Sequence, residues 1–378
     1  MKPRACLDLT PLSTGSRFRG IGTYALALAR ALAATPCEDL ELYALVGRGV
    51  RTRVLPLAEA VARAMDSSAG PPVPYAAHYA LAHTAGAARL AGRVDLFHAT
   101  DPKGAPCLPG MRTVTTCHDL IPTVLGPPYR PAWVPSAAVA LVDRLRYRLP
   151  DRVIAISEHT RSDLVGATGL PPSRISVVHH GVDHDRFRPA AATAHRPYFL
   201  YVGGFDARKQ VPALVRAFGR RAGDFDESLL IAGQMRPAWE GPIRDAIAAS
   251  GAGDRVQLAG FVDEDRLSTL YQGATAHVMA STYEGFGMTV LEAFASGCPV
   301  IAARASCVPE IAGDAALLVP PLDEVALGDA LVRVARDRAL RASLRERGIR
   351  RAAAFTWERC ARETLDVYRA TLGVPTNG

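Results

Sequence analysis

The stretch Ser281-Thr282-Tyr283-Glu284-Gly285-Phe286-Gly287-Met288-Thr289-Val290-Leu291-Glu292 decides how the whole chain is interpreted. The apolar run 276–279 before it predicts a buried strand, and the apolar spacing over 290–296 predicts a helix. Glu284 and Glu292 therefore flank a glycine turn at a helix start, where free N–H groups and the helix dipole attract anions. Such a unit could hold a nucleotide, with its phosphates on the N–H groups and its ribose on a carboxylate. The plainer interpretation is a strand–turn–helix unit with two solvated glutamates.

Length and composition indicate a globular chain of two domains. Its 378 residues are many for one hydrophobic core, and 49% hydrophobic with 21% charged residues excludes a disordered chain. The chain contains no run of about 18 apolar residues, and its first residues have no stretch typical of a signal peptide. The seven cysteines are scattered without a C-x-x-C pair, so we expect reduced thiols in a cytoplasmic protein.

Positive charge is concentrated late in the chain. The formal net charge is +7, and ten arginines lie between positions 333 and 362 against three carboxylates. A further basic helix is predicted over 131–149. Nucleic-acid-binding proteins carry such charge among aromatic residues or on a recognisable module, whereas the late stretch has two aromatic residues and no module. We therefore expect no nucleic-acid partner and solvated helix faces, with an anionic membrane surface as the alternative.

Strands and helices are predicted to alternate on both sides of a linker. A strand over 4–9 and a helix to about residue 34 open the chain. The proline- and alanine-rich segment 187–197 lacks periodicity and is the best linker candidate. A strand over 198–202 and a helix from about residue 211 then restart the pattern. Alternation of this kind predicts two doubly wound α/β domains.

The predicted first domain carries two candidate ligand positions. Gly20 and Gly22 lie between a strand and a helix, although the third glycine of a dinucleotide fingerprint is missing. His118 directly follows the predicted strand 112–117, at the edge where open α/β sheets bind ligands. Residues 51–92 are alanine-rich, are expected to be mostly helical, and indicate no function.

Taken together, these segments resemble the retaining glycosyltransferases of the GT-B fold, family GT4 or group 1, in their mannosyltransferase-like branch. The core stretch with its continuation to residue 302 resembles that family's Glu-x7-Glu segment, and His118-Asp119-Leu120-Ile121-Pro122 resembles its His-Asp-Leu-Ile-Pro motif. Segment 175–183 resembles the family's link between domains, but His179-His180 replaces Pro-Asn there. Whether these histidines contact phosphate or solvent stays open.

The resemblance implies a GT-B architecture, in which two Rossmann-like, doubly wound α/β domains face a cleft. On this basis we expect residues 1–188 to bind the acceptor and residues 189–355 to bind the nucleotide-sugar donor. Residues 356–378 are expected to form a helix that crosses back to the first domain. Only the segment 36–92 has no counterpart in the family pattern.

The resemblance also implies roles for individual residues. Arg208 and Lys209 would hold the donor diphosphate, because arginine forks onto phosphate and lysine acts as a point charge. Glu292 would accept from the ribose, whereas Glu284 and His118 would contact the sugar; His118, Arg208, Lys209 and Glu284 form the expected catalytic set. The other expected donor-binding residues contribute mainly backbone: Gly20, Gly22, Gly204, Gly260, Phe261, Val262, Gly285, Phe286, Gly287, Met288 and Thr289. Gly204 stands where many relatives have an arginine.

The implied reaction is a front-face transfer with retention, without a metal or cofactor. A double displacement would need two carboxylates about 5 Å apart across the bond, and the family pattern gives neither glutamate that position. The donor is expected to be GDP-mannose or a similar nucleotide sugar, with UDP- or dTDP-sugars as alternatives. The acceptor would be a hydroxyl of a glycan, a lipid-linked compound or a small molecule. A nucleotide-sugar epimerase and a non-catalytic nucleotide-sugar binding protein are the competing classes.

Overall fold

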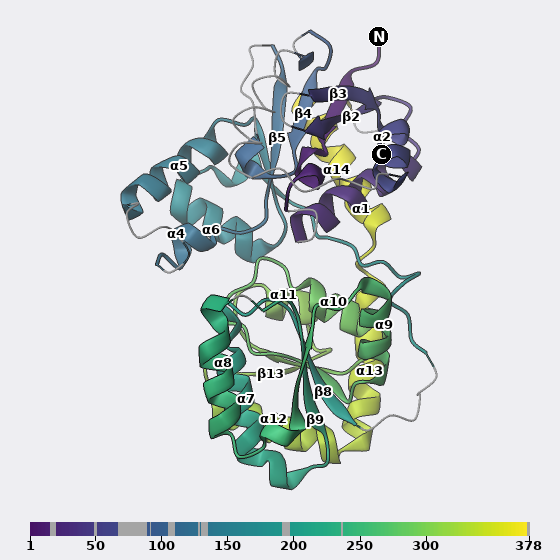
Figure 1. Cartoon of the computed structure of the whole chain (residues 1–378). Coiled ribbons are helices and arrows are strands. Elements are labelled where there is room, and N and C mark those ends of the chain that lie inside the picture. The colour runs from purple at the N-terminus through teal and green to yellow at the C-terminus, as the bar shows by residue number, and fades with distance from the viewer. Residues whose placement is uncertain are drawn as a thin grey trace. The chain divides into compact units, whose positions relative to one another are not determined.

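The computed structural model describes residues 1–15, 20–48, 51–66, 89–90, 92–104, 110–127, 129, 135–190, 197–235 and 237–375 (Figure 1). The chain forms two compact units. Unit 1 comprises Met1–Gly181 and Trp357–Gly378, and unit 2 comprises Val182–Thr356. Each unit is built on one sheet with helices packed against it, so the predicted α/β class with two Rossmann-like domains is confirmed.

Unit 1 has a seven-stranded sheet in the order β3-β2-β1-β4-β5-β6-β7. All neighbouring strands are parallel except β2 and β3, which form an antiparallel pair at one edge. The strands are β1 (Arg4–Asp8), β2 (Glu41–Arg48), β3 (Arg51–Pro56), β4 (Leu96–Ala99), β5 (Arg112–Cys117), β6 (Arg152–Ala155) and β7 (Ile175–Val177).

The last helix of the chain belongs to unit 1, where it packs on α1 and on β5. Leu28 and Leu32 of α1 are buried together with Leu365 and Tyr368 of α14, so the two helices share one apolar core. Ser157 accepts the N–H of Thr160 and thereby caps α6. The α-helices of this unit are α1 (Gly20–Ala34), α2 (Leu57–Asp66), α4 (Ile121–Val124), α5 (Ser136–Arg148), α6 (Glu158–Thr168) and α14 (Trp357–Leu372).

Unit 2 has a six-stranded, wholly parallel sheet in the order β10-β9-β8-β11-β12-β13. The strands are short and almost continuously apolar, as is typical of strands covered on both faces. Their bounds are β8 (Tyr198–Val202), β9 (Ser228–Ala232), β10 (Val256–Gly260), β11 (Ala276–Met279), β12 (Val300–Ala303) and β13 (Leu317–Val319).

The helices of unit 2 form two layers on opposite faces of this sheet (Figure 1). In one layer α7 packs between α8 and α12, and in the other α10 packs between α9 and α13. Asp263, Asp323 and Asp337 accept backbone N–H groups at the starts of α9, α12 and α13. The bounds are α7 (Val211–Arg221), α8 (Pro237–Ala249), α9 (Glu264–Gly273), α10 (Met288–Ala295), α11 (Val308–Ala312), α12 (Glu324–Arg336) and α13 (Arg338–Ala352).

The strand order of unit 2 creates a switch point between β8 and β11. From β8 the chain first adds β9 and β10 on one side, and it then returns to place β11 on the other side. Because every strand is parallel, the segments that follow β8 and β11 leave the sheet at the same edge. Open α/β sheets bind ligands at such a point, and the predicted residues 203–209 and 280–289 both lie there.

The boundary between the units lies seven residues before the expected one. The backbone N–H of Val182 donates to the carbonyl of Phe355 at 3.1 Å, and Ser268 Oγ donates to the carbonyl of Arg186 at 2.8 Å. Phe187 is buried in unit 2 as well. These contacts attach residues 182–188 to unit 2, so the chain passes from unit 1 to unit 2 at residues 181–182. The expectation that segment 187–197 links the two units is therefore wrong, because this segment belongs to unit 2. Residues 191–196 of the expected linker lie outside the described residues.

The expectation that 51–92 is mostly helical is wrong for its beginning. Residues 51–56 form β3, whose partner β2 lies in the segment that lacked a family counterpart. The alanine-rich composition that favours a helix is realised in α2, whereas 67–88 lie outside the described residues. Within the part of the chain that the structure describes, no helix has the length and apolarity needed to cross a membrane.

Candidate active site

The start of α10 has the geometry that the glycine turn predicts. β11 is fully buried and leads through residues 280–287 into the helix. Gly287 lies at the N-cap with φ +95°, a conformation that side chains other than hydrogen disfavour. No side chain caps the helix at this residue. The first N–H groups of α10 are therefore not used by a capping side chain and are oriented as in anion-binding helix starts.

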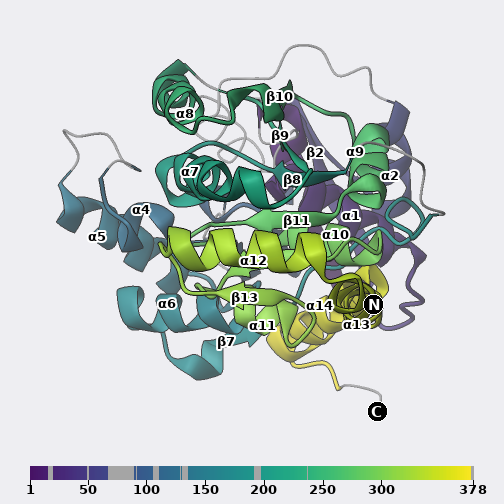
Figure 2. The same cartoon turned by 90° about the horizontal axis from the view of Figure 1, so that it is seen from below.

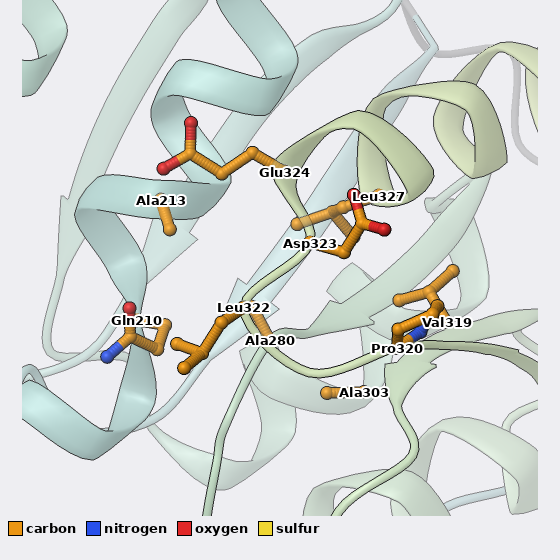
Figure 3. A pocket seen from close by; sticks show the side chains of 10 residues that line it. All are labelled: Gln210, Ala213, Ala280, Ala303, Val319, Pro320, Leu322, Asp323, Glu324 and Leu327. Atoms are coloured by element: carbon orange, nitrogen blue, oxygen red, sulfur yellow. The ribbon is translucent and has the colours of Figure 1, made fainter.

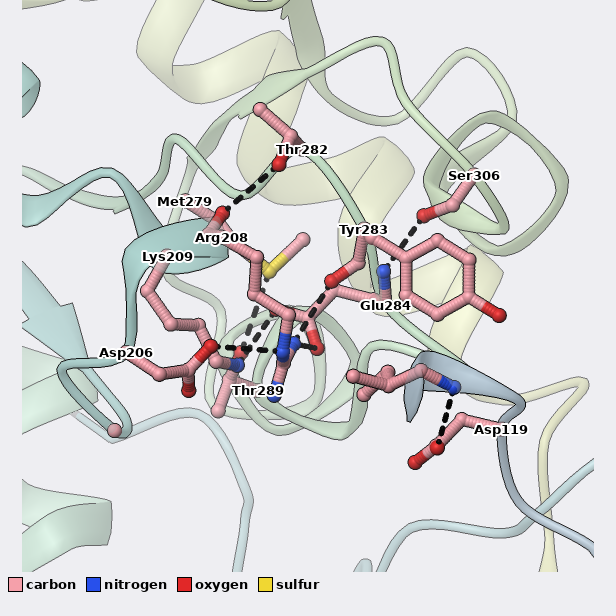
Figure 4. Close-up of polar contacts among 12 residues, drawn as sticks. Asp119, Asp206, Arg208, Lys209, Met279, Thr282, Tyr283, Glu284, Thr289 and Ser306 are labelled. Carbon is pink, nitrogen blue, oxygen red and sulfur yellow. Dashed lines mark hydrogen bonds and ion pairs between the residues drawn. The ribbon is translucent and has the colours of Figure 1, made fainter. Parts of the chain in front are cut away.

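Two cations from the segment after β8 converge on Glu284 (Figure 4). Lys209 Nζ lies 2.6 Å from Oε1 of Glu284, and Arg208 Nη1 lies 3.0 Å from Oε2. Arg208 Nη1 also donates to the carbonyl of Tyr283 at 2.8 Å. Residues predicted separately from two glycine turns are thus joined in one cluster at the switch point.

Asp206 holds the other side of the arginine. Its Oδ1 lies 3.0 Å from Nε of Arg208, so the guanidinium is held between two carboxylates, those of Asp206 and Glu284. The backbone N–H of Thr282 donates to the carbonyl of Arg208 at 2.8 Å, which fixes the turn itself. With Lys209 included, the cluster has two positive and two negative charges. Such pairing allows charged groups to be largely buried.

Glu284 is ionised at neutral pH. Burial alone would raise the pKa of its carboxyl, but the nearby charges of Lys209 and Arg208 outweigh burial and lower the pKa to about 2. Its backbone N–H donates to Oγ of Ser306 at 2.8 Å, which orients the residue further. A carboxylate in this state accepts hydrogen bonds and does not supply a proton.

Glu292 lies one turn inside α10 and is half-buried. The hydroxyl of Tyr271, on α9, donates to Oε2 of Glu292 at 3.1 Å. Burial first, and then the charge of Glu292, raises the pKa of Tyr271, so this hydroxyl keeps its proton. This hydrogen bond from α9 holds the carboxylate of Glu292 in place.

The expected base-binding turn Gly260-Phe261-Val262 follows β10 at the same edge of the sheet. Gly260 has φ +68°, and its carbonyl accepts the N–H of Gly233 at 2.8 Å. Beside this turn is a cavity of about 190 Å³. The cavity is lined by Phe205, Ile231, Gly233, Met235, Glu240, Arg244, Leu258 and Gly260. This cavity, lined by both apolar and charged side chains, thus adjoins the backbone turn that was expected to contact the base of the nucleotide.

A second hollow lies at the starts of α7 and α12 (Figure 3). Its free volume of about 10 Å³ is no more than one water molecule needs. Gln210 and Leu322, which line it, both have positive φ angles of 53° and 62°. We assign no ligand to this hollow.

In unit 1, His118 is half-buried directly after β5. Its Nε2 lies 2.8 Å from the carbonyl oxygen of Thr100, and since a carbonyl only accepts, Nε2 must have the proton. Burial lowers the pKa of His118, so the ring is neutral at pH 7 and Nδ1 is an acceptor. The ring of Tyr24 packs against it edge-on at 4.9 Å.

The structure answers the open question about His180. This residue is only 4% exposed, and its ring packs against those of Tyr24 at 4.6 Å and Trp357 at 5.7 Å, inclined at 26° to each. Burial lowers the pKa of His180 well below its usual value. His180 is thus a neutral member of an aromatic cluster that also borders His118 at 5.8 Å, and not a solvated residue.

Several predicted residues of unit 2 lie together, and three others belong to unit 1. Arg208, Lys209 and Glu284 are in direct contact, and Gly285 to Thr289 adjoin them along the chain. The carbonyl of Gly204, in the same turn after β8, accepts a hydrogen bond from the hydroxyl of Tyr201. Gly20 and Gly22 lie in the first turn of α1 instead of before it, and with His118 they belong to unit 1.

Sequence reasoning missed several partners of these residues. Asp206 had a signal, since it lies two positions before Arg208 in the predicted turn. Tyr271 had none, because its hydroxyl reaches Glu292 only through the packing of α9 on α10.

Asp8, at the end of β1, is fully buried, and burial raises its pKa to about 7. Among the described residues, no group of three or more histidine, cysteine or carboxylate side chains is arranged to hold a metal ion.

Two family models match this chain, one for each half. Residues 183–351 match the model for "Glycosyl transferases group 1", and residues 18–186 match the model for "Glycosyltransferase Family 4". "O-antigen chain mannosyltransferase B" of Escherichia coli is 27% identical over 274 residues, which are 68% of this chain and 70% of that protein. "MMP alpha-(1->4)-mannosyltransferase" of Mycolicibacterium hassiacum is 29% identical over 62% of this chain and 57% of that protein.

A solved structure shares the fold over the whole chain. Sucrose-phosphate synthase from Thermosynechococcus elongatus superposes with a TM-score of 0.79. The alignment covers 99% of this chain and 100% of the synthase chain, at 23% sequence identity. At this identity the similarity shows the GT-B fold and nothing finer.

Proposed function

We infer, from the membership of this chain in the GT-B glycosyl transferases of group 1, that it is a retaining hexosyltransferase. The donor would be a nucleotide diphosphate sugar, and the acceptor a hydroxyl of a glycan, a lipid-linked compound or a small molecule. The convergence of Arg208 and Lys209 on Glu284, beside the uncapped start of α10, carries this proposal.

The cluster has the charges that a departing diphosphate requires. When the bond between the sugar and the phosphate breaks, negative charge develops on the phosphate, and preorganised donors there lower the barrier most. Arg208 offers N–H groups in a fixed plane, and Lys209 offers a compact charge. Asp206 and Glu284 hold both side chains in place before the donor arrives. Little reorganisation is then needed at the moment of reaction.

Glu284 and His118 are assigned to hydroxyl groups of the donor sugar. Ionised Glu284 accepts hydrogen bonds, and Nδ1 of neutral His118 accepts one as well. Glu292 is assigned to the ribose, with Tyr271 holding its carboxylate. The backbone at Gly260-Phe261-Val262 is assigned to the base, and that of Gly20, Gly22 and 285–289 to the diphosphate.

Retention is proposed to proceed by front-face transfer, in which the departing phosphate takes the acceptor proton. The state of Glu284 supports this choice, because a carboxylate paired with two cations is a weak nucleophile and a weak base. Arg208 and Lys209 would supply the positive charge at the phosphates, so the proposed reaction uses no metal or cofactor.

GDP-mannose is the proposed donor, with UDP- and dTDP-sugars as alternatives. Both relatives described above have mannosyltransferase names, which supports this choice. We also propose a cytoplasmic protein that contacts the inner face of the membrane peripherally and binds no nucleic acid.

The test supplies sugar nucleotides with and without candidate hydroxyl acceptors and measures nucleoside diphosphate release. We expect release only when both substrates are present, with the anomeric configuration of the product, followed by NMR, equal to that of the donor. Conversion of the sugar nucleotide alone would indicate an epimerase. Binding without turnover on any acceptor would indicate a non-catalytic binding protein.

A further inference from the structure

Helix α5 exposes its apolar side to solvent. Asp143 and Tyr147 are its buried members, and both are polar or amphipathic. Four large apolar side chains on α5 and at its end are about half exposed or more, and Val124 of α4 beside them is 44% exposed. The four are Leu141 (56%), Val142 (49%), Leu145 (51%) and Leu149 (61%). An amphipathic helix on a water-facing surface has the opposite arrangement.

Specific contacts fix this orientation. The carboxylate of Asp143 accepts from Oγ1 of Thr123 and pairs with Arg146. The ring of Tyr147 packs with Cys117 and Leu120 in a small apolar core. Turning the helix to bury its leucines would break the Asp143 contacts and expose Tyr147. The apolar surface is therefore a stable feature of unit 1.

The exposed apolar surface has a basic border. Leu141, Leu145 and Leu149 follow one another at four-residue spacing, so they form one stripe along the helix. Arg144 and Arg148, also four residues apart, lie beside the stripe and are exposed, and Nη2 of Arg148 donates to the carbonyl of Gly169 at 2.8 Å. The only carboxylate on α5, that of Asp143, points inward. We call Val124, Leu141, Val142, Leu145 and Leu149 with the two arginines the α5 face.

Figures 1 and 2 both show α5 at the rim of unit 1, next to α4 and α6. Each of the three leucines of the stripe is more than half exposed. Three leucines and two valines in one exposed patch are unusual for a surface that contacts only water.

The arginine-rich helices near the end of the chain are different. Arg345 donates to the carbonyl of Gly297 at 3.0 Å, and Arg351 donates to that of Ile311 at 2.8 Å. Arg350 pairs with Glu346. Between residues 333 and 362, all of which the structure describes, no large apolar side chain is exposed. What separates these arginines from those of α5 is that no exposed large apolar side chain lies in the same described stretch.

We propose that the α5 face binds an anionic membrane surface. This inference rests on the membrane contact proposed above and locates it on α5 instead of on the late arginine-rich helices. The apolar stripe would enter the boundary between head groups and acyl chains, while Arg144 and Arg148 extend to the head-group phosphates. A twofold pairing of two such faces would bring four arginines together, so the charges favour a lipid surface over a second copy.

The test is sedimentation of the full chain with vesicles of phosphatidylcholine alone or with added phosphatidylglycerol. We expect binding to the anionic vesicles that weakens at high salt. The double variant Leu141→Gln/Leu145→Gln should lower the partition coefficient about tenfold or more, since each leucine loses its apolar burial. Val325→Gln, at an exposed valine of α12 (63%), is the matched control and should bind as the unchanged protein does. Arg144→Gln/Arg148→Gln should reduce the salt dependence.

Equal vesicle binding by the leucine variant and the unchanged chain would overturn the assignment to α5. If the unchanged chain did not bind, the membrane contact itself would be wrong. Sedimentation velocity without vesicles provides a separate outcome, because a dimer that the leucine variant abolishes would assign the face to a second copy. Sugar-nucleotide turnover with a water-soluble acceptor should be equal in all variants, so the result is independent of the proposed activity.

Discussion

Lys209→Ala should lower turnover strongly, because Lys209 is one of the two cations at the proposed diphosphate site. Removing one preorganised donor from a developing oxyanion costs about 2–4 kcal/mol, or about 30- to 1,000-fold in rate. The side chain of Lys209 is only 16% exposed, and its Nζ lies 2.6 Å from Oε1 of Glu284. Water therefore replaces the lost positive charge poorly. Arg208→Ala should act on the same scale, and it also removes the ion pair with Asp206.

The assay is nucleoside diphosphate release at saturating donor with an acceptor that supports it. Arg216→Ala is the matched control, because Arg216 is an exposed cation of unit 2 that pairs with Glu324, away from the cluster. It should leave turnover unchanged. A loss of less than about threefold for both Lys209→Ala and Arg208→Ala would refute the diphosphate assignment.

The same variant has a second readout that does not depend on activity. The pKa of Glu284 lies at about 2, below its unfolded value, so its contribution to stability is present at neutral pH and is lost as pH falls through that pKa. Without Lys209, the effect of burial is less opposed and the pKa of Glu284 rises. The acid unfolding midpoint of Lys209→Ala should therefore move to higher pH, and the same midpoint in both proteins would contradict this coupling.

Glu292→Ala should raise the donor KM with little change in kcat, and a large loss of kcat at unchanged KM would contradict the ribose role. Tyr271→Phe should act in the same direction and more weakly, since it removes only the hydrogen bond that holds Glu292. Burial raises the pKa of Asp8 to about 7, so the free energy of unfolding should fall by about 4 kcal/mol as pH rises from about 4 to above 7. Asp8→Asn should remove this fall, which urea unfolding at pH 4 and pH 8 measures. The same pH dependence of the unfolding free energy in both proteins would rule out this role of Asp8. A ligand at 100 times its Kd stabilises a protein by about 2.7 kcal/mol, which a thermal-shift panel of nucleotide sugars detects. GDP-mannose should stabilise this chain most. Stabilisation only by UDP- or dTDP-sugars would contradict the proposed donor and leave the fold assignment unaffected.

Local features of the fold could be predicted because their causes are local. Gly287 has a positive φ, and glycine in an apolar strand–turn–helix pattern indicates such a turn. Asp263 caps α9, and an aspartate directly before a helical stretch is a local signal for a helix start. The β2–β3 hairpin was missed, because the alanine-rich composition that follows it favours a helix and its antiparallel pairing leaves no long-range pattern in one sequence.

Contacts between distant segments could not be predicted from the residues alone. Lys209 and Glu284 are 75 positions apart, and they meet because β8 and β11 are neighbours in the sheet. Periodicity gives the strands but not their order. His180 is similar, since its burial depends on Tyr24 and Trp357, which come from opposite ends of the chain. The family resemblance supplied the roles of the site residues, and these roles stay predictions.

The diphosphate role of Arg208, Lys209 and Glu284 is tested most directly by calorimetry that compares nucleoside diphosphates with the corresponding monophosphates. The panel is GDP, UDP and dTDP with GMP, UMP and dTMP, on the unchanged chain and on Lys209→Ala. If the cluster of Arg208, Lys209 and Glu284 receives the donor diphosphate, one diphosphate should bind more tightly than its monophosphate, and Lys209→Ala should lose that preference. A preference that survives in the variant, or no binding of any diphosphate, would contradict the assignment of this cluster to the donor diphosphate.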